Sequence, residues 1–248
     1  MWVSPEILNW FSRNAGSYYN TEDECRKAYE IWKHAENILL NQNNKLHLID
    51  AVCALKRAMS HRLGILNNLY HFNNIPLPQK PKRIIEQLAF LGIIRPLMLK
   101  KLIDIRNLVE HANADPPDID TCFEFLDIIW YFLRTTDRLV HLVADSIELC
   151  DAYNYDNINY SISLDIDVLS SWCISGSGWL PFSFVSFDKI DNWIEVQTTS
   201  VTRWKDSKLK EIDKTIIRND EDLGFTSDMI IISGDHKRKI YELYFLSI

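Results

Sequence analysis

One segment of this 248-residue chain combines residue types that could act on a phosphodiester. It reads KKLIDIRNLVEH over residues 100–111, and its apolar residues recur with the period of a helix that begins at Pro96. At about 100° per residue, one side of this helix is an apolar arc formed by Met98, Leu102, Ile105, Val109 and Ala112. The opposite side is a polar stripe formed by Lys100, Asp104, Asn107 and His111. We therefore expect His111 to lie away from the core.

Arg106, Asn107 and His111 are the candidate catalytic residues of this helix. A histidine can take a proton from the 2′-hydroxyl of RNA or protonate the leaving oxygen. An arginine offers a fixed fork of donors to phosphate oxygens and can stabilise the charge that builds up on phosphorus. Asn107 lies one turn before His111 and could orient the imidazole or hold a phosphate oxygen. This chemistry requires no metal ion.

The run Arg106-Asn107-Leu108-Val109-Glu110-His111 resembles the R-x(4–6)-H motif of the HEPN superfamily, including the polar residue that often follows the arginine. The resemblance covers about residues 21–150 and implies a helical bundle with the motif late in one helix. Many members of the superfamily are metal-independent endoribonucleases of toxin, defence or stress systems, and others are binding modules without activity. The resemblance also implies a homodimer in which the motifs of two protomers meet, and an antitoxin or other protein is a possible partner.

The spacing of the motif leaves a second interpretation open. Arg106 and His111 are five residues apart, so an ideal helix turns them about 140° away from each other. Arg106 is instead placed to pair with Glu110 four residues later, in a simple helix salt bridge. For catalysis, either the helix loosens at its end or a second subunit supplies the missing group.

Basic residues dominate the region around the motif. Between residues 80 and 106, seven Lys and Arg face only Glu86 and Asp104. This surplus could contact RNA phosphates or could be a solvated basic surface. The candidate RNA-binding residues are Arg95, Lys100 and Lys101.

The sequence predicts no metal site and no cofactor. His34, His47, His61, His71 and His141 lie ten or more residues from one another, without the spacing of zinc ligands. The cysteines are odd in number and form no C-x-x-C pair, so we expect neither a disulfide framework nor a cysteine metal site. A glycine-rich phosphate loop is also absent from the sequence.

The elements expected to position the motif are helical up to about residue 150. Periodicity and breaks at Asn73–Pro81, Gly92 and Ala114–Pro117 predict helices over about 21–41, 45–71, 82–91, 96–112 and 118–149. Period-two alternation then predicts a strand over 162–168, with further strands at 182–187 and 193–199 and a hairpin of 229–232 with 240–246. The expected fold class is α+β: an N-terminal all-α helical bundle (1–150, HEPN-like) followed by a small, mostly antiparallel β domain (158–248).

Charge separates these two parts. Residues 158–248 carry 10 Lys and Arg against 14 Asp and Glu, within a net charge of −7 for the whole chain. Acidic surface repels RNA. We therefore expect the β part to pack on the helical part or recruit a protein, and its tryptophans to serve core or partner contacts rather than base stacking.

Two functions follow from these observations. The first is a metal-independent endoribonuclease of HEPN type, acting as a homodimer on RNA. The second is a non-catalytic dimerisation and binding protein, whose β domain recognises a protein or small molecule. The first residues lack a signal peptide and no segment is long and apolar enough to span a membrane, so we expect a cytoplasmic protein without membrane contact.

Overall fold

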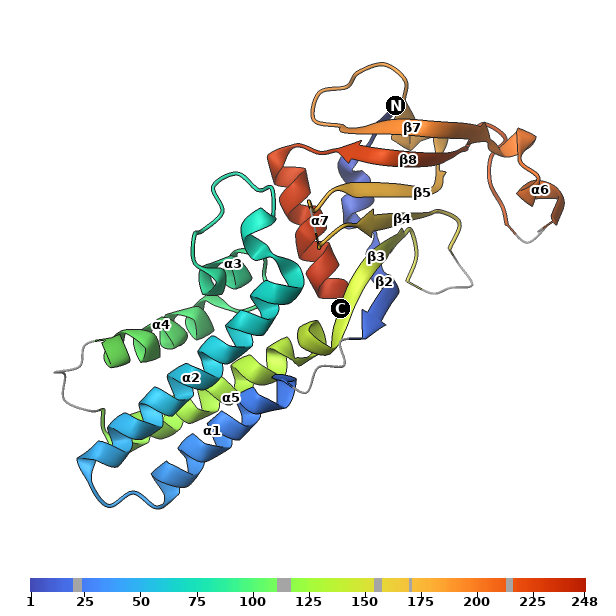
Figure 1. Ribbon diagram of the computed structural model, residues 1–248. Helices are drawn as coiled ribbons and strands as arrows, with labels where there is room; N and C mark the ends of the chain where they lie inside the picture. Colours follow the sequence, from blue (N-terminus) through green and yellow to red (C-terminus); the bar gives the residue numbers. More distant parts are fainter. Residues whose placement is uncertain (20–23, 111–116, 154–157, 170, 213–215) are drawn as a thin grey trace. The chain divides into compact units, whose positions relative to one another are not determined.

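The computed structural model describes residues 1–19, 24–110, 117–153, 158–169, 171–212 and 216–248 (Figure 1). They divide into two compact units. The helical unit holds residues 19–73 and 79–143, and the β unit holds residues 1–18, 74–78 and 144–248. The helical unit therefore interrupts the β unit in the sequence.

The helical unit consists of α1 (Glu24–Leu40), α2 (Lys45–Tyr70), η2 (Phe72–Asn74), α3 (Ile84–Phe90), α4 (Pro96–Glu110) and α5 (Ile119–His141). Side-chain oxygens begin two of the long helices: Asn44 accepts from the His47 amide, and Asp118 accepts from the Thr121 amide. Helix α2 packs against α1, α4 and α5, and its alanines Ala51, Ala54 and Ala58 are almost fully buried. Such small side chains allow the neighbouring helices to approach closely.

A buried arginine joins three of these helices. Arg62 of α2 has no exposed surface, and its Nη1 donates to the Leu133 carbonyl, to Thr136 Oγ1 and to Asp137 Oδ1, all on α5, at 3.0–3.1 Å. Asp137 Oδ2 accepts from the hydroxyl of Tyr29 on α1 at 2.7 Å. Burial raises the pKa of Tyr29 to about 12, and the hydrogen bond to Asp137 acts in the same direction.

We expect Asp137→Asn to destabilise the helical unit by about 3 kcal/mol, because the buried guanidinium then has no compensating charge. Asp127→Asn is the matched control, since Asp127 is exposed on the same helix. Urea unfolding of both variants, followed by far-UV circular dichroism, measures the difference. Equal midpoints for the two variants would show that the Arg62 charge is satisfied without Asp137.

The raised pKa of Tyr29 predicts that the free energy of unfolding depends on pH. Its neutral form is favoured in the folded protein, so its contribution is complete below about pH 10 and is lost as pH rises toward about 12. Replacement Tyr29→Phe should therefore flatten the fall in unfolding free energy across this interval. Denaturant titrations at several pH values compare the two slopes, and identical slopes would contradict the expectation.

The β unit is built on an eight-stranded sheet with the order β2-β3-β4-β5-β8-β7-β1-β6. Every strand pair whose register is described is antiparallel. The strands are β1 (Trp2–Val3), β2 (Phe11–Tyr19), β3 (Leu142–Cys150), β4 (Ser161–Ile166), β5 (Ile174–Leu180), β6 (Val185–Ser186), β7 (Ile194–Arg203) and β8 (Leu223–Ile231). Short helices connect them: η1 (Pro5–Asn9), η4 (Phe182–Phe184), η5 (Trp204–Asp206) and α6 (Leu209–Ile212), and α7 (Gly234–Ser247) follows β8.

One face of this sheet is apolar and is covered by η1 and α7, which pack side by side (Figure 1). Trp172 stacks edge-on against Tyr241 and Tyr244 of α7, and all three side chains are buried. The Tyr244 hydroxyl donates to the Ala144 carbonyl at 2.6 Å and fixes α7 to β3. The core of this face includes Val3, Ile162, Leu164, Val196, Phe225 and Ile230.

A second aromatic cluster closes one end of the same sheet. The guanidinium of Arg218 lies 4.9 Å from the ring of Trp204, 5.0 Å from that of Trp179 and 5.7 Å from that of Tyr160. The Tyr160 hydroxyl donates to the buried Asp222 carboxylate at 2.6 Å. These contacts occupy the tryptophan rings with the chain's own cation.

The predicted fold class is wrong. The sheet is large rather than small, and the first 150 residues are not all helical, because residues 1–18 contain β1, η1 and β2 and residues 142–150 form β3. Strand β2 is at the sheet edge and lacks clear alternation, and β3 continues directly from α5 without a break in apolar character. The segment 240–246, predicted as a strand, lies in α7, whose buried Ile240, Tyr241 and Tyr244 follow a helical period.

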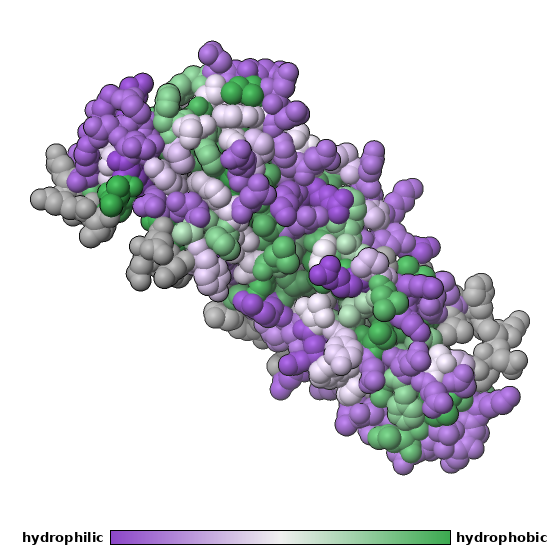
Figure 2. All heavy atoms as spheres, turned by 180° about the vertical axis from the view of Figure 1, so that it is seen from behind, coloured by the Kyte–Doolittle hydropathy of each residue, from purple (hydrophilic) through white to green (hydrophobic). Residues whose placement is uncertain are grey.

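In the part of the chain that the structure describes, no helix has the length and apolar character needed to cross a membrane. Figure 2 shows one face of the molecule, on which hydrophilic residues predominate and hydrophobic residues form smaller groups between them.

Candidate functional site

Helix α4 presents the expected faces. Leu102 and Ile105 are completely buried, whereas Lys100 and Asn107 are exposed. Within the described residues, Leu102 and Ile105 of the predicted apolar arc therefore meet the core, whereas Lys100 and Asn107 of the predicted polar stripe do not. The helix extends through Arg106, of which the structure describes the backbone, and ends at Glu110. His111 lies outside the described residues.

The candidate RNA-binding residues differ in whether another side chain already pairs with them. Lys101 Nζ lies 3.0 Å from Glu124 Oε2, an ion pair that connects α4 to α5. Arg95 immediately precedes α4 and is exposed, as is Lys100. Lys100 and Asn107 are seven residues apart and share one helix face. Arg95, Lys100 and Asn107 are thus accessible to a ligand, whereas Lys101 already has a partner.

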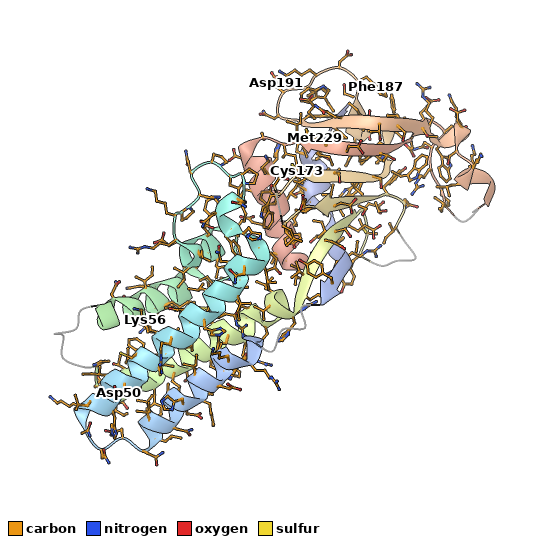
Figure 3. All side chains as sticks on the ribbon, in the orientation of Figure 1. Asp50, Lys56, Cys173, Phe187, Asp191 and Met229 are labelled. Atoms are coloured by element: carbon orange, nitrogen blue, oxygen red, sulfur yellow. The ribbon has the colours of Figure 1, made fainter. Side chains whose placement is uncertain are left out.

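A groove with a volume of about 1220 Å³ lies between α1 and α2, and Figure 3 labels Asp50 and Lys56, two of its lining residues. We call it the α1–α2 groove. Its α1 wall consists of Lys27, Ile31, His34 and Ile38, and Asn41 of the turn after α1 continues this wall. Its α2 wall consists of His47, Asp50, Cys53, Lys56, Arg57, Ser60 and His61.

Helical spacing explains how these residues meet. On each helix the lining residues recur at intervals of three or four, so they occupy one face, and the alanines buried beside them bring the two faces together. Three basic residues line the groove, and Asp50 is its one carboxylate among the lining residues. Nδ1 of His47 and Nδ1 of His61 are buried and have no hydrogen-bond partner within the described residues.

The α1–α2 groove was not predicted from the sequence. His34, His47 and His61 are distant from one another in the sequence, but the turn at 41–44 brings α1 and α2 together, and all three line the groove. A usable signal was present in the polar residues at 47, 50, 53, 57 and 60–61, which recur along one side of α2. Among the described residues, no three His, Cys, Asp or Glu side chains are grouped as metal ligands.

The β unit offers a hollow of opposite character. It measures about 280 Å³ on the sheet face away from α7 and is lined by Asp145, Asp165, Asp167 and Asp228 beside Cys173 and Ser175. The register explains the cluster, because Asp165 pairs with Ser175 across β4 and β5. Four carboxylates around one small hollow disfavour an anionic ligand.

Comparison of the chain with protein-family models, with curated proteins and with solved structures found no match.

Two substitutions on α4 test its orientation. Ile105→Ala should destabilise the helical unit by about 2–5 kcal/mol, because it leaves a cavity at a fully buried position. Asn107→Ala should change stability by less than about 0.5 kcal/mol, because the side chain is exposed. Both are measured by urea unfolding. A larger loss for Asn107→Ala than for Ile105→Ala would reverse the assignment of the two faces.

Proposed function

We propose that this protein is a metal-independent endoribonuclease of HEPN type that acts as a homodimer in the cytoplasm. The observation that carries the proposal is the exposed polar side of α4. Asn107 is free of the core in the last described turns of the helix, one residue after Arg106 and four before His111, while Leu102 and Ile105 anchor the opposite side.

The proposed reaction is an internal attack on phosphorus. The imidazole of His111 removes the proton from a 2′-hydroxyl, and the 2′-oxygen forms a bond to the adjacent phosphorus. The bond to the 5′-oxygen breaks, and that oxygen takes up a proton, which leaves a 2′,3′-cyclic phosphate. Arg106 donates to the non-bridging oxygens, whose negative charge increases in the transition state. Asn107 holds the imidazole or a phosphate oxygen in place.

A two-fold dimer would resolve the spacing of the motif. Within one regular helix Arg106 and His111 are turned about 140° apart, so one copy of α4 does not aim both at the same phosphate. An isologous contact between two α4 helices places the arginine of one protomer near the histidine of its partner. The exposed Lys100 adds positive charge to the same helix, and the exposed Arg95 immediately precedes it.

Cleavage of a labelled RNA by the full-length protein in EDTA tests the proposal. His111→Ala should reduce the rate at least about 100-fold, the usual contribution of a general acid–base group. The control is His141→Ala, because His141 is exposed on α5 and should not affect the rate. An RNA with 2′-deoxy substitution at the cleaved position should remain intact.

Equal cleavage by wild type and His111→Ala would contradict the proposal and identify a contaminating nuclease. A wild-type protein that does not cleave would instead favour a non-catalytic binding protein, in which Arg106 pairs with Glu110. Mixing Arg106→Ala with His111→Ala protein tests the shared site. One intact composite site in each mixed dimer would restore about a quarter of wild-type activity, whereas sites within single protomers would restore none.

A further inference from the structure

We infer that the α1–α2 groove binds the phosphate backbone of single-stranded RNA; this inference rests on the proposed function and assigns the surface that holds the substrate. The groove is distinct from the motif on α4, since all of its lining residues lie on α1, α2 and the turn between them.

The charge of the groove favours a polyanion. Lys27, Lys56 and Arg57 line it against the single carboxylate of Asp50. On an ordinary solvated helix pair, lysines and arginines commonly face carboxylates at i+3 or i+4. In the described part of the chain, these three cations take part in no ion pair, whereas Lys33 on the neighbouring face of α1 pairs with Glu36. The groove therefore holds a surplus of positive charge, three cations to one carboxylate, and none of the three is neutralised by an ion pair within the described residues.

Its polar atoms also require a partner. Nδ1 of His47 and Nδ1 of His61 are shielded from solvent and make no hydrogen bond within the described residues. Leaving a buried polar atom unpaired costs about 1–3 kcal/mol. A rotation of either ring that turns Nδ1 toward the groove would let a phosphate oxygen seated there accept from it and remove this cost. The two histidines are fourteen residues apart on α2, which corresponds to about 21 Å along the helix axis.

Size and lining point to a polymer rather than a small anion. Pockets for small molecules usually measure about 300–1000 Å³, and this groove exceeds that range at about 1220 Å³. Its length of about 21 Å accommodates several consecutive phosphates of one strand. Ile31, Ile38 and Cys53 supply apolar surface between the charged residues, against which ribose and base faces can pack. The acidic hollow of the β unit offers none of these features.

Binding is measured with a fluorescein-labelled 12-nucleotide oligouridylate and the full chain carrying His111→Ala, so that cleavage does not intervene. Lys56→Gln with Arg57→Gln should weaken binding at least tenfold at low salt. The slope of log affinity against log salt should become shallower by about 1.4, since each lost phosphate contact removes about 0.7. The control is Lys33→Gln with Lys45→Gln, which removes the same amount of charge, one residue each from α1 and α2, at positions that do not line the groove, and should weaken binding less than threefold.

A gain of affinity separates this inference from a folding defect. Asp50→Asn removes the one carboxylate from the lining and should tighten binding about threefold or more, because the side chain is exposed and no longer repels phosphate.

Protection of a cysteine locates the bound RNA. In the protein that carries only His111→Ala, bound oligouridylate should slow the alkylation of Cys53, which lines the groove. The exposed Cys173 of the β unit is the internal control, and its alkylation rate should not change.

Equal affinities for the groove pair and its control, or no protection of Cys53, would overturn the inference. If polyglutamate competes as strongly as unlabelled oligouridylate, the inference is overturned in favour of an acidic protein partner. If millimolar inorganic phosphate fully displaces the oligouridylate, the groove is a small-anion site and the inference is also overturned.

The groove and the catalytic motif can be rejected independently of each other. Loss of cleavage in His111→Ala together with unchanged binding in the Lys56→Gln, Arg57→Gln variant rejects only the groove. Lost binding in the groove pair with cleavage unaffected by His111→Ala rejects only the catalytic motif.

Discussion

Arg62 brings a full positive charge into the interior of the helical unit, where desolvation would be costly without several acceptors. Leu133, Thr136 and the Asp137 carboxylate, all on α5, accept from its two terminal nitrogens, whereas Nε has no partner within the described residues. Tyr29 extends the contact to α1 through Asp137. Because a buried charge tolerates few arrangements of its partners, this network fixes the rotation of α2 against its neighbours. The walls of the α1–α2 groove begin one residue from Arg62 and two from Tyr29, so their spacing depends on the same network.

The two units separate charge in a way that the net value of −7 conceals. The groove of the helical unit collects cations, and the open face of the sheet collects aspartates. A polyanion drawn to the first would be repelled by the second. The acidic sheet face is therefore unsuited to bind a polyanion itself.

Long periodic helices were predictable from the sequence, because α1, α2 and α5 each bury one side and the apolar residues repeat accordingly. Strand β4 was predictable for the same reason, with Ile162, Leu164 and Ile166 inward. Strand β2 was not, since an edge strand such as FSRNAGSYY shows no regular alternation of buried and exposed residues. The groove also escaped prediction, because it requires two helices to meet and periodicity describes each helix alone.

The order of the strands in the sheet has a consequence for synthesis on the ribosome. Trp2 pairs with Glu195, and the amino group of Met1 donates to the Val196 carbonyl, 195 residues away. At about 5–20 residues per second, roughly ten to forty seconds pass before that partner strand emerges. The helical unit, whose residues 19–73 and 79–143 are made in between, can fold in this interval. During it, the apolar Val3, Ile7 and Leu8 have no sheet to pack on, so the nascent chain exposes an early segment that a holding chaperone would shield.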